Sequence, residues 1–139
     1  ERRVLDMALD GTTRAIQPVL TPAEICGMQE VVRLIYIDDQ VKEYILNVVR
    51  ATRDPAAFQL ADLAPLIDYG ASPRASIYWG LGARAMAFLN GRGYVTPQDV
   101  KDIAQDVLRH RVILTYEAEA EELNSDQVVK QIFDSIEVP

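Results

Sequence analysis

The stretch over residues 68–92 constrains the fold more than any other part of the chain. It opens with Gly70-Ala71-Ser72-Pro73, where Gly and Ala suit a turn, Ser suits a helix N-cap, and Pro suits the first helical position. The residues that follow, about 73–90, are apolar on more than one face, and Gly91 or Gly93 supplies a stop. A helix of this kind is normally buried among several partners. The stretch therefore predicts a central helix inside a helical bundle.

Within this central helix we expect one apolar stripe of Ile77, Leu81, Ala85 and Phe88, widened by Tyr78 and Leu89. A second stripe consists of Trp79, Ala83 and Met86. Gly80 and Gly82 would each cost about 1 kcal/mol relative to Ala in a helix interior. We interpret both glycines as positions that other helices approach closely.

Four further segments carry helix signals. Thr21-Pro22-Ala23-Glu24 is a capping box before a helix over about 22–34, and Thr96-Pro97 starts an amphipathic helix that runs to Leu108. Asp38 or Asp39 suits the cap of a helix ending near Arg53, and Ser125 suits the cap of the last helix. The residues expected to face inward on these helices are, in chain order, Ile25, Met28, Val32 and Ile35; Val41, Tyr44, Ile45, Val48 and Val49; Val100, Ile103, Ala104, Val107 and Leu108; and Val128, Val129, Ile132, Phe133 and Ile136.

The remaining segments leave little room for a sheet. Residues 56–69 form a connector with a turn of helix at about 60–68. Residues 112–115 are β-prone, and we expect them to pair with Tyr94-Val95 or Tyr36-Ile37. The predicted fold class is mainly α, a helical bundle of about five helices with at most a very small β element.

Composition narrows the function classes. The net charge of −7 argues against a general nucleic-acid binder, and no apolar run approaches the ~18 residues of a membrane span. One His and one Cys leave no Cys/His zinc site, so no metal site is expected. Cys26 lies on an amphipathic helix, where we expect a buried structural thiol in a reducing compartment. The first residues lack Met and a secretory layout, so we expect a cut inside a longer protein.

Arg74 is the candidate binding residue. It falls in the first turn of the central helix, where the helix dipole is positive and a cation costs roughly 0.3–1 kcal/mol unless an anion lies nearby. A guanidinium, the Ser72 hydroxyl and backbone N–H groups at one helix start suit a phosphate or carboxylate. From the local pattern alone, however, a contact between Arg74 and a surface Asp or Glu is the simpler interpretation.

A family resemblance favours the phosphate contact of Arg74 over a contact with a surface acid. Residues 70–76 followed by Ala83-Arg84-Ala85-Met86-Ala87 resemble the second-sensor helix of MoxR-type AAA+ ATPases. Further matches are Ala51-Thr52-Arg53-Asp54-Pro55, Gly91 to Val100, and Val107 to Arg111. The resemblance runs from about Val19 to Pro139 and implies the helical lid domain that follows a nucleotide-binding core, with residues 1–20 as the tail of the core and connector and 21–139 as the lid. Magnesium-chelatase ATPase subunits have related lids.

The resemblance also implies a function for the full-length protein. Arg74 would act as the second-sensor residue toward ATP bound with Mg²⁺ on the core, with Ser72 a minor phosphate contact. The full-length protein would be a cytoplasmic, chaperone-like ATPase that forms a hexameric ring, with a von Willebrand factor A-domain protein as a possible partner, and without nucleic acid or membrane insertion. The dipeptide Gly-Lys of a P-loop is absent, so the chain alone should not hydrolyse ATP. The alternative class is a helical protein-interaction module without a nucleotide role.

Several other residues receive structural interpretations. We expect Arg84 to pair with an acid or to face a neighbouring subunit, because it lies about 15 Å along the helix from Arg74. Arg53 and Arg92 are interpreted as helix-end caps, and His110 as a helix-end residue. Trp79 and Tyr78 are expected in the core, with one of them bordering an adenine as the alternative.

Overall fold

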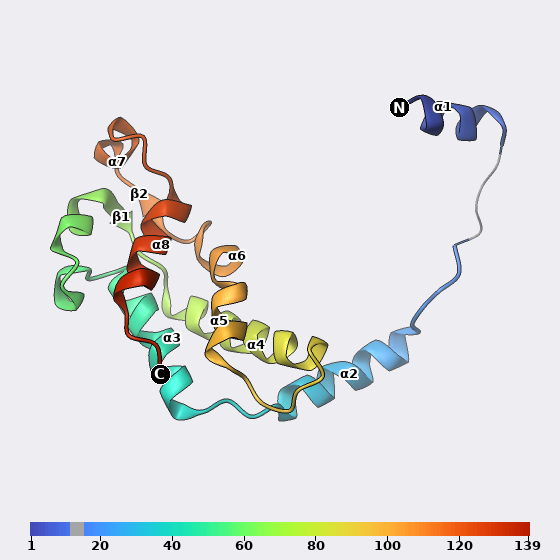
Figure 1. Cartoon of the computed structure of the whole chain (residues 1–139), viewed down its shortest axis with the longest axis horizontal. Coiled ribbons are helices and arrows are strands. Elements are labelled where there is room, and N and C mark those ends of the chain that lie inside the picture. The colour runs from blue at the N-terminus through green and yellow to red at the C-terminus, as the bar shows by residue number, and fades with distance from the viewer. Residues whose placement is uncertain (12–15) are drawn as a thin grey trace. The chain divides into compact units, whose positions relative to one another are not determined.

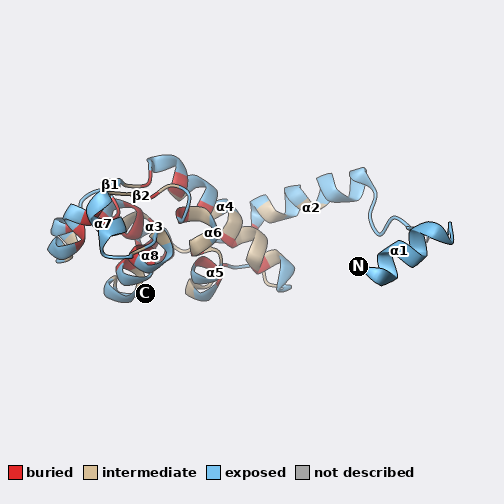
Figure 2. Ribbon diagram, turned by 90° about the horizontal axis from the view of Figure 1, so that it is seen from above, coloured by how far each residue is buried: buried red, intermediate tan, exposed pale blue. Residues whose placement is uncertain are grey.

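The structure is a computed structural model that describes residues 1–11 and 16–139 (Figure 1). The chain forms two compact units, residues 1–30 and 31–139. The first contains α1 (Arg2–Leu9) and most of α2 (Pro22–Leu34), and the second contains all other elements. The buried core lies in the second unit, whereas α1 buries no residue (Figure 2).

The start of α2 is as predicted. The Thr21 N–H donates to Glu24 Oε2 at 2.7 Å, and the Glu24 N–H donates to Thr21 Oγ1 at 3.3 Å, which completes the capping box. No residue of α2 itself is buried. Of the expected stripe, Met28 and Val32 are partly buried, and Ile35 is buried just beyond the end of the helix. Ile25 is 45% exposed, and Cys26 is an exposed thiol rather than a buried one. An amphipathic pattern identifies a helix but does not supply the surface that covers it.

The next helix, α3 (Asp39–Ala51), agrees with the sequence in both start and phase. Asp38 is its N-cap and accepts a hydrogen bond from the Gln40 N–H at 2.9 Å. The predicted inward-facing residues are all buried: Val41, Tyr44, Ile45, Val48 and Val49. This helix therefore forms one wall of the core, and α4 packs against it.

The connector after α3 consists of two 3₁₀ helices, η1 (Ala56–Phe58) and η2 (Ala61–Leu66), followed by β1 (Ile67–Tyr69). β1 pairs antiparallel with β2 (Ile113–Leu114), in the register Ile67 to Leu114 with an irregularity before Tyr69. The predicted partner of the β-prone segment is therefore wrong. Tyr36 and Tyr94 instead form an isolated parallel bridge with each other.

The central helix is α4 (Pro73–Leu89), which packs against α3, α5 and α6. The first predicted stripe is not the buried face, since Ile77 is 62% and Leu81 46% exposed. Trp79 and Ala83 of the second predicted stripe are buried, in a line of residues spaced four apart: Ala75, Trp79, Ala83 and Ala87. Three alanines in line let neighbouring helices approach closely, and Trp79 fills the space between them.

Trp79 lies at the centre of this core. It is fully buried, its Nε1–H donates to the Val100 carbonyl at 2.8 Å, and its ring meets Phe133 edge-on at 5.4 Å. Of the two helix glycines, a Cβ at Gly82 would lie 2.6 Å from Ile103 Cδ1, whereas a Cβ at Gly80 would meet nothing within 4 Å. The close-approach interpretation therefore holds for Gly82 and is wrong for Gly80.

The rest of the chain completes the bundle. Thr96 caps α5 (Pro97–Asp102), but the predicted single helix is broken at Ile103, and α6 (Ala104–Leu108) follows. After β2 come α7 (Tyr116–Ala120) and α8 (Ser125–Ser135), whose N-cap is Asn124 rather than Ser125. The fold class is confirmed as mainly helical with one small sheet among the described residues. None of the described helices is both long and apolar enough to cross a bilayer.

Candidate functional site

The candidate site is the start of α4. Ser72 has the extended backbone of an N-cap, with φ −71° and ψ 164°, and Pro73 takes the first helical turn as predicted. The Ala75 N–H donates to the Ser72 carbonyl at 2.8 Å. The Ser72 hydroxyl, however, makes no capping hydrogen bond, so the position is as predicted but the side-chain cap is absent. The hydroxyl is exposed and available to a ligand.

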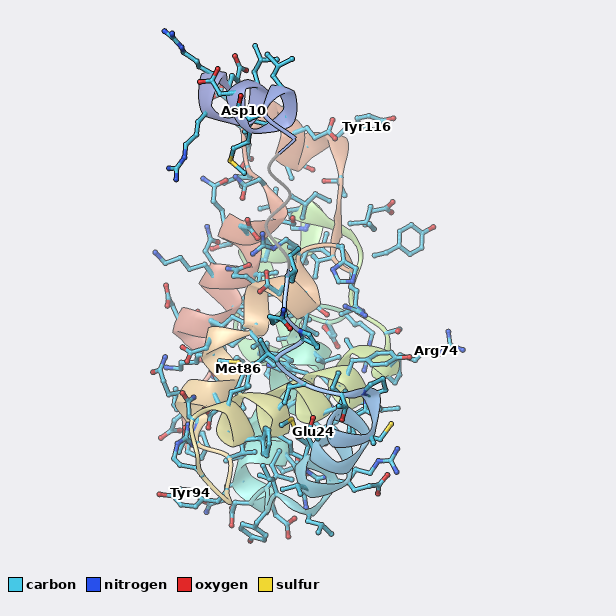
Figure 3. All side chains as sticks on the ribbon, turned by 90° about the vertical axis from the view of Figure 1, so that its right-hand side faces the viewer. Asp10, Glu24, Arg74, Met86, Tyr94 and Tyr116 are labelled. Atoms are coloured by element: carbon cyan, nitrogen blue, oxygen red, sulfur yellow. The ribbon has the colours of Figure 1, made fainter. Side chains whose placement is uncertain are left out.

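Arg74 projects from this helix start into open space (Figure 3). Its side chain is exposed, and it makes neither a hydrogen bond nor an ion pair with any residue that the structure describes. The simpler local interpretation, a contact with a surface acid, is therefore not observed over residues 1–11 and 16–139. A guanidinium in a first helical turn without a compensating carboxylate leaves this end of the helix positively charged.

The backbone that carries Arg74 is held by the end of α3. Thr52, the C-cap of α3, is fully buried, and its Oγ1 accepts a hydrogen bond from the Ala71 N–H at 2.9 Å. Arg53 Nη1 donates to the Ala71 carbonyl at 3.0 Å. The backbone N–H and carbonyl of Ala71, the residue before the N-cap, are thus both bound by consecutive residues of another element.

Gly70 makes this approach possible. A Cβ at this position would lie 2.2 Å from the Thr52 carbonyl oxygen and 2.7 Å from the Arg53 nitrogen. Contacts this short with backbone atoms cannot be relieved by rotating a side chain. The absence of a side chain at Gly70 therefore lets the two segments meet.

An apolar groove of about 360 Å³ runs along α4 beyond Arg74. It is lined from α4 by Ser76, Ile77, Gly80, Leu81 and Arg84, and from the other wall by Ile37, Lys42, Ile45 and Leu46. Residues 74, 77 and 81 share one face of the helix by spacing, so the free guanidinium and the exposed apolar side chains face the same way.

Arg84, at the far end of this groove, does not pair with an acid among the described residues. Its Nη1 donates to the Arg33 carbonyl at 3.2 Å, near the end of α2. In place of an ion pair, Arg84 therefore contacts a helix C-terminus, where a cation suits the dipole. The other expected role of Arg84, facing a neighbouring subunit, stays a prediction.

The other end of α4 is anchored by Arg92 and Asp99. Gly91 adopts a left-handed conformation with φ +69°, and the Arg92 N–H donates to the Ala87 carbonyl at 2.9 Å. The Arg92 side chain does not cap a helix as predicted; both of its terminal nitrogens bind the carboxylate of Asp99, one of them at 2.7 Å. Asp99 is 1% exposed and also accepts hydrogen bonds from the Thr96 N–H and hydroxyl, each at 2.8 Å.

This network fixes the charge of Asp99. The hydrogen bond from Arg92, with further hydrogen bonds from Thr96, holds the pKa of the Asp99 carboxyl well below its usual range, against the opposing effect of burial. The carboxylate is therefore ionised and paired, which is the condition for burying a charge at low cost. It stabilises the loop between α4 and α5.

The aromatic residues of α4 divide between the two sides of the helix. Trp79 belongs to the core as expected, but Tyr78 is 56% exposed and lies under the Arg111 guanidinium, 5.7 Å from the ring centre. The expected core position of Tyr78 is therefore wrong. His110 is exposed beside the end of α6, and its side chain makes no hydrogen bond or ion pair with a residue that the structure describes.

Sequence reasoning missed the junction formed by Thr52, Arg53, Gly70 and Ala71. Both segments appear in the family resemblance, but nothing in their spacing indicates that they touch. Two local signals were present: a Thr-Arg pair at a helix end before Asp-Pro, and a Gly two residues before an N-cap. Among the described residues no group of three His, Cys, Asp or Glu side chains is placed to hold a metal ion.

Comparisons with known proteins agree with this architecture. A family model described as "AAA lid domain" matches residues 59–132, which includes Ser72, Arg74 and the Arg92–Asp99 pair. The chain is 33% identical to "Chaperone MoxR1" of Mycobacterium tuberculosis over all of its own length and 37% of that protein. It is 37% identical to "Protein MoxR" of Paracoccus denitrificans over 71% of the chain and 31% of that protein.

A solved structure is similar over nearly the whole chain. It is described as that of a "putative ATPase" from Cytophaga hutchinsonii, with a TM-score of 0.88 and 34% identity over 99% of this chain and 42% of the other. The chain thus spans well under half the length of each of these relatives. The resemblance to MoxR-type proteins seen in the sequence is confirmed by these matches.

Proposed function

Because the chain belongs to the AAA lid domain family, we propose that it is the lid of a MoxR-type AAA+ ATPase and closes over ATP bound to a nucleotide-binding core. The core would be residues of the same protein outside this sequence, since the matched relatives are more than twice as long. Residues 21–139 form the lid, and residues 1–20 form the tail of the core and the connector. The parent protein hydrolyses ATP and uses the closure to remodel or mature a client complex.

Arg74 carries the proposal. It is an exposed guanidinium without a partner in the described part of the chain, placed where the helix dipole disfavours a cation. Such a charge is stabilised when an anion with several oxygens arrives, and Arg matches phosphate geometry. We assign Arg74 the second-sensor role, contacting the γ-phosphate of ATP when the lid closes.

The chain fits one part of the nucleotide and leaves the rest to the core. Ser72 offers an exposed hydroxyl beside Arg74 and fits a second phosphate contact. Nothing in the described part is arranged to hold Mg²⁺, and the sequence lacks a P-loop. The core would therefore supply the Mg²⁺ ligands and the phosphate-binding loop. When bound, Mg²⁺ would neutralise part of the phosphate charge. Arg74 would add a positive charge close to the γ-phosphate, where negative charge is redistributed during phosphoryl transfer.

The assembly and cellular setting follow from the same proposal. The full-length protein acts in the cytoplasm as a homo-oligomeric ring, hexameric by family resemblance, with a von Willebrand factor A-domain protein as a partner. The second candidate function is a nucleotide-independent interaction module, which the exposed apolar groove beside Ile77 and Leu81 favours. A lid of the magnesium-chelatase type is the alternative within the wider family.

The experiment compares Arg74→Ala with Arg50→Ala in the full-length protein. Arg50 is an exposed arginine whose nearest carboxylate oxygen, on Glu43, lies 3.9 Å away, so its loss controls for general charge removal. Turnover of ATP per folded molecule should fall by roughly 10- to 1,000-fold for Arg74→Ala, as for other lost transition-state donors. Nucleotide affinity should change less, because the phosphate loop of the core remains.

Two outcomes would reject the phosphate role. One is an Arg74→Ala protein that turns over ATP as fast as Arg50→Ala. The other is an isolated chain that unfolds when Arg74 is replaced, since Arg74 would then be structural. If Arg74→Ala leaves turnover intact but abolishes binding of a protein client, the interaction module is the better description.

A further inference from the structure

We propose that Thr52 is a positioning residue for Arg74, acting through the peptide backbone at the start of α4. The proposal rests on the phosphate-contacting role of Arg74 proposed above. It concerns a side chain that is itself buried and does not reach the ligand.

The Thr52 hydroxyl joins two elements with one oxygen atom. It donates its hydrogen to the Val49 carbonyl at 2.7 Å within α3 and accepts the Ala71 N–H at 2.9 Å from a segment 19 residues later. Because the single hydroxyl hydrogen is used inside α3, the oxygen lone pair is oriented toward Ala71. The hydroxyl therefore has a fixed direction as well as a fixed place.

Two further contacts remove the remaining freedom of this junction. Arg53 Nη1 holds the Ala71 carbonyl at 3.0 Å, so the peptide groups on both sides of Ala71 are tied to the end of α3. Gly70 lies against the backbone of Thr52 so closely that a Cβ would overlap the Thr52 carbonyl oxygen at 2.2 Å. Rotating or shifting the chain at residues 70–71 would break a buried hydrogen bond or create this overlap.

Arg74 depends on this junction because nothing else in the described structure orients it. Its side chain has no partner among the described residues, so its position follows from the helix that begins at Pro73. A misplacement of about 1 Å at a catalytic contact can cost roughly 100-fold in rate. The junction therefore also couples movement of α3 to the position of the guanidinium.

The test is a double-mutant cycle in the full-length ATPase. Thr52→Val keeps the side-chain shape and removes the hydroxyl, whereas Thr52→Ser keeps the hydroxyl. We expect Thr52→Val to lower kcat by about tenfold, because a displacement of less than 1 Å should cost part of the roughly 100-fold loss that 1 Å can cause. The kcat of Thr52→Ser should stay within about twofold of that of the natural protein. In the Arg74→Ala background, Thr52→Val should change kcat by less than about twofold, because coupled residues are not additive.

The outcomes separate this inference from the proposed function. If Arg74→Ala itself leaves turnover unchanged, the proposed function fails. If Arg74→Ala lowers turnover but Thr52→Val has no effect, or lowers kcat equally in both backgrounds, the positioning role fails and Thr52 is only structural. The positioning role is supported if Thr52→Val lowers kcat less in the Arg74→Ala background than in the natural protein, and if Thr52→Ser retains kcat.

Arg53→Met provides the same test if Thr52→Val does not fold. Arg53 is exposed, so its replacement leaves the core intact while removing the contact to the Ala71 carbonyl. Its loss should lower kcat by about threefold, a fraction of what a displacement of about 1 Å costs, and only while Arg74 is present. An equal loss without Arg74 would overturn the proposal.

Discussion

Replacing Asp99 with Asn should destabilise the isolated chain more than any comparable surface change. The carboxylate is 1% exposed and binds the Arg92 guanidinium together with the N–H and hydroxyl of Thr96. Breaking a buried ion pair by removing one charge typically costs about 3–5 kcal/mol. Arg92 retains 27% exposure, and Asn can keep part of the bonding to Thr96. We therefore expect about 2–3 kcal/mol, within the range for lost charged hydrogen bonds.

Thermal unfolding followed by far-UV circular dichroism measures this loss. For a chain of 139 residues, about 2–3 kcal/mol corresponds to a fall in Tm of roughly 6–12 °C. Asp106→Asn is the matched control, because that carboxylate is 78% exposed and pairs with Arg109 at 3.0 Å. Its effect should stay within about 0.5 kcal/mol, as for other exposed ion pairs and surface positions.

The pH dependence gives an independent check. Arg92 lowers the folded-state pKa of Asp99, so the unfolded chain binds a proton more readily than the folded chain. The stability that Asp99 contributes is therefore fully present above its unfolded pKa of about 3.9 and is lost as the pH falls through the folded pKa. The Tm difference between the natural chain and Asp99→Asn should be constant from about pH 7 to 5 and narrow below about pH 4. A variant within 2 °C of the natural chain at pH 7, or a difference that grows in acid, would refute this reasoning.

Three further predictions concern the isolated chain. Gly70→Ala should lower Tm strongly because its Cβ would overlap the Thr52 carbonyl, whereas Gly80→Ala should be neutral or stabilise by up to about 1 kcal/mol; equal effects in thermal melts would contradict the packing argument. The chain alone should show no ATP turnover above blank and no stable hexamer, checked by phosphate release and light scattering; Mg²⁺-dependent hydrolysis would overturn the lid proposal. Amides of α1, which buries no side chain, should exchange hydrogen much faster than those of α4, and equal protection by mass spectrometry would show a partner surface within the chain.

Helix starts were the most predictable feature of this protein. Thr21, Asp38 and Thr96 all cap the helices expected of them, because each cap joins atoms within three residues along the chain. The phase of α3 was equally predictable, since its apolar residues occupy one face. Helix caps and the buried face of a helix with one apolar side can be predicted without knowing which elements pack against that helix.

The buried face of the central helix could not be predicted from the sequence. With apolar residues on several faces, α4 has no unique phase, and the packing of its neighbours selected the alanine line with Trp79 rather than the face with Ile77 and Leu81. The break at Ile103 lies where its side chain contacts the position of Gly82. The pairing of Ile67 with Leu114 depends on how the ends of distant helices meet.

In the candidate site, too, some features follow from the local sequence and others only from the tertiary structure. The Gly-Ala-Ser-Pro-Arg sequence by itself determined that a helix begins near residue 73 and that an arginine lies in its first turn, because turn, cap and proline preferences act over a few adjacent residues. Only the tertiary structure decided that Arg74 lacks an acidic partner among the described residues, that Arg92 pairs with Asp99, and that Thr52 holds Ala71. The pair of Arg92 and Asp99 joins two side chains, and the contact of Thr52 with Ala71 joins a side chain to backbone. Packing brings these groups together, and no short-range preference in the sequence encodes the contacts.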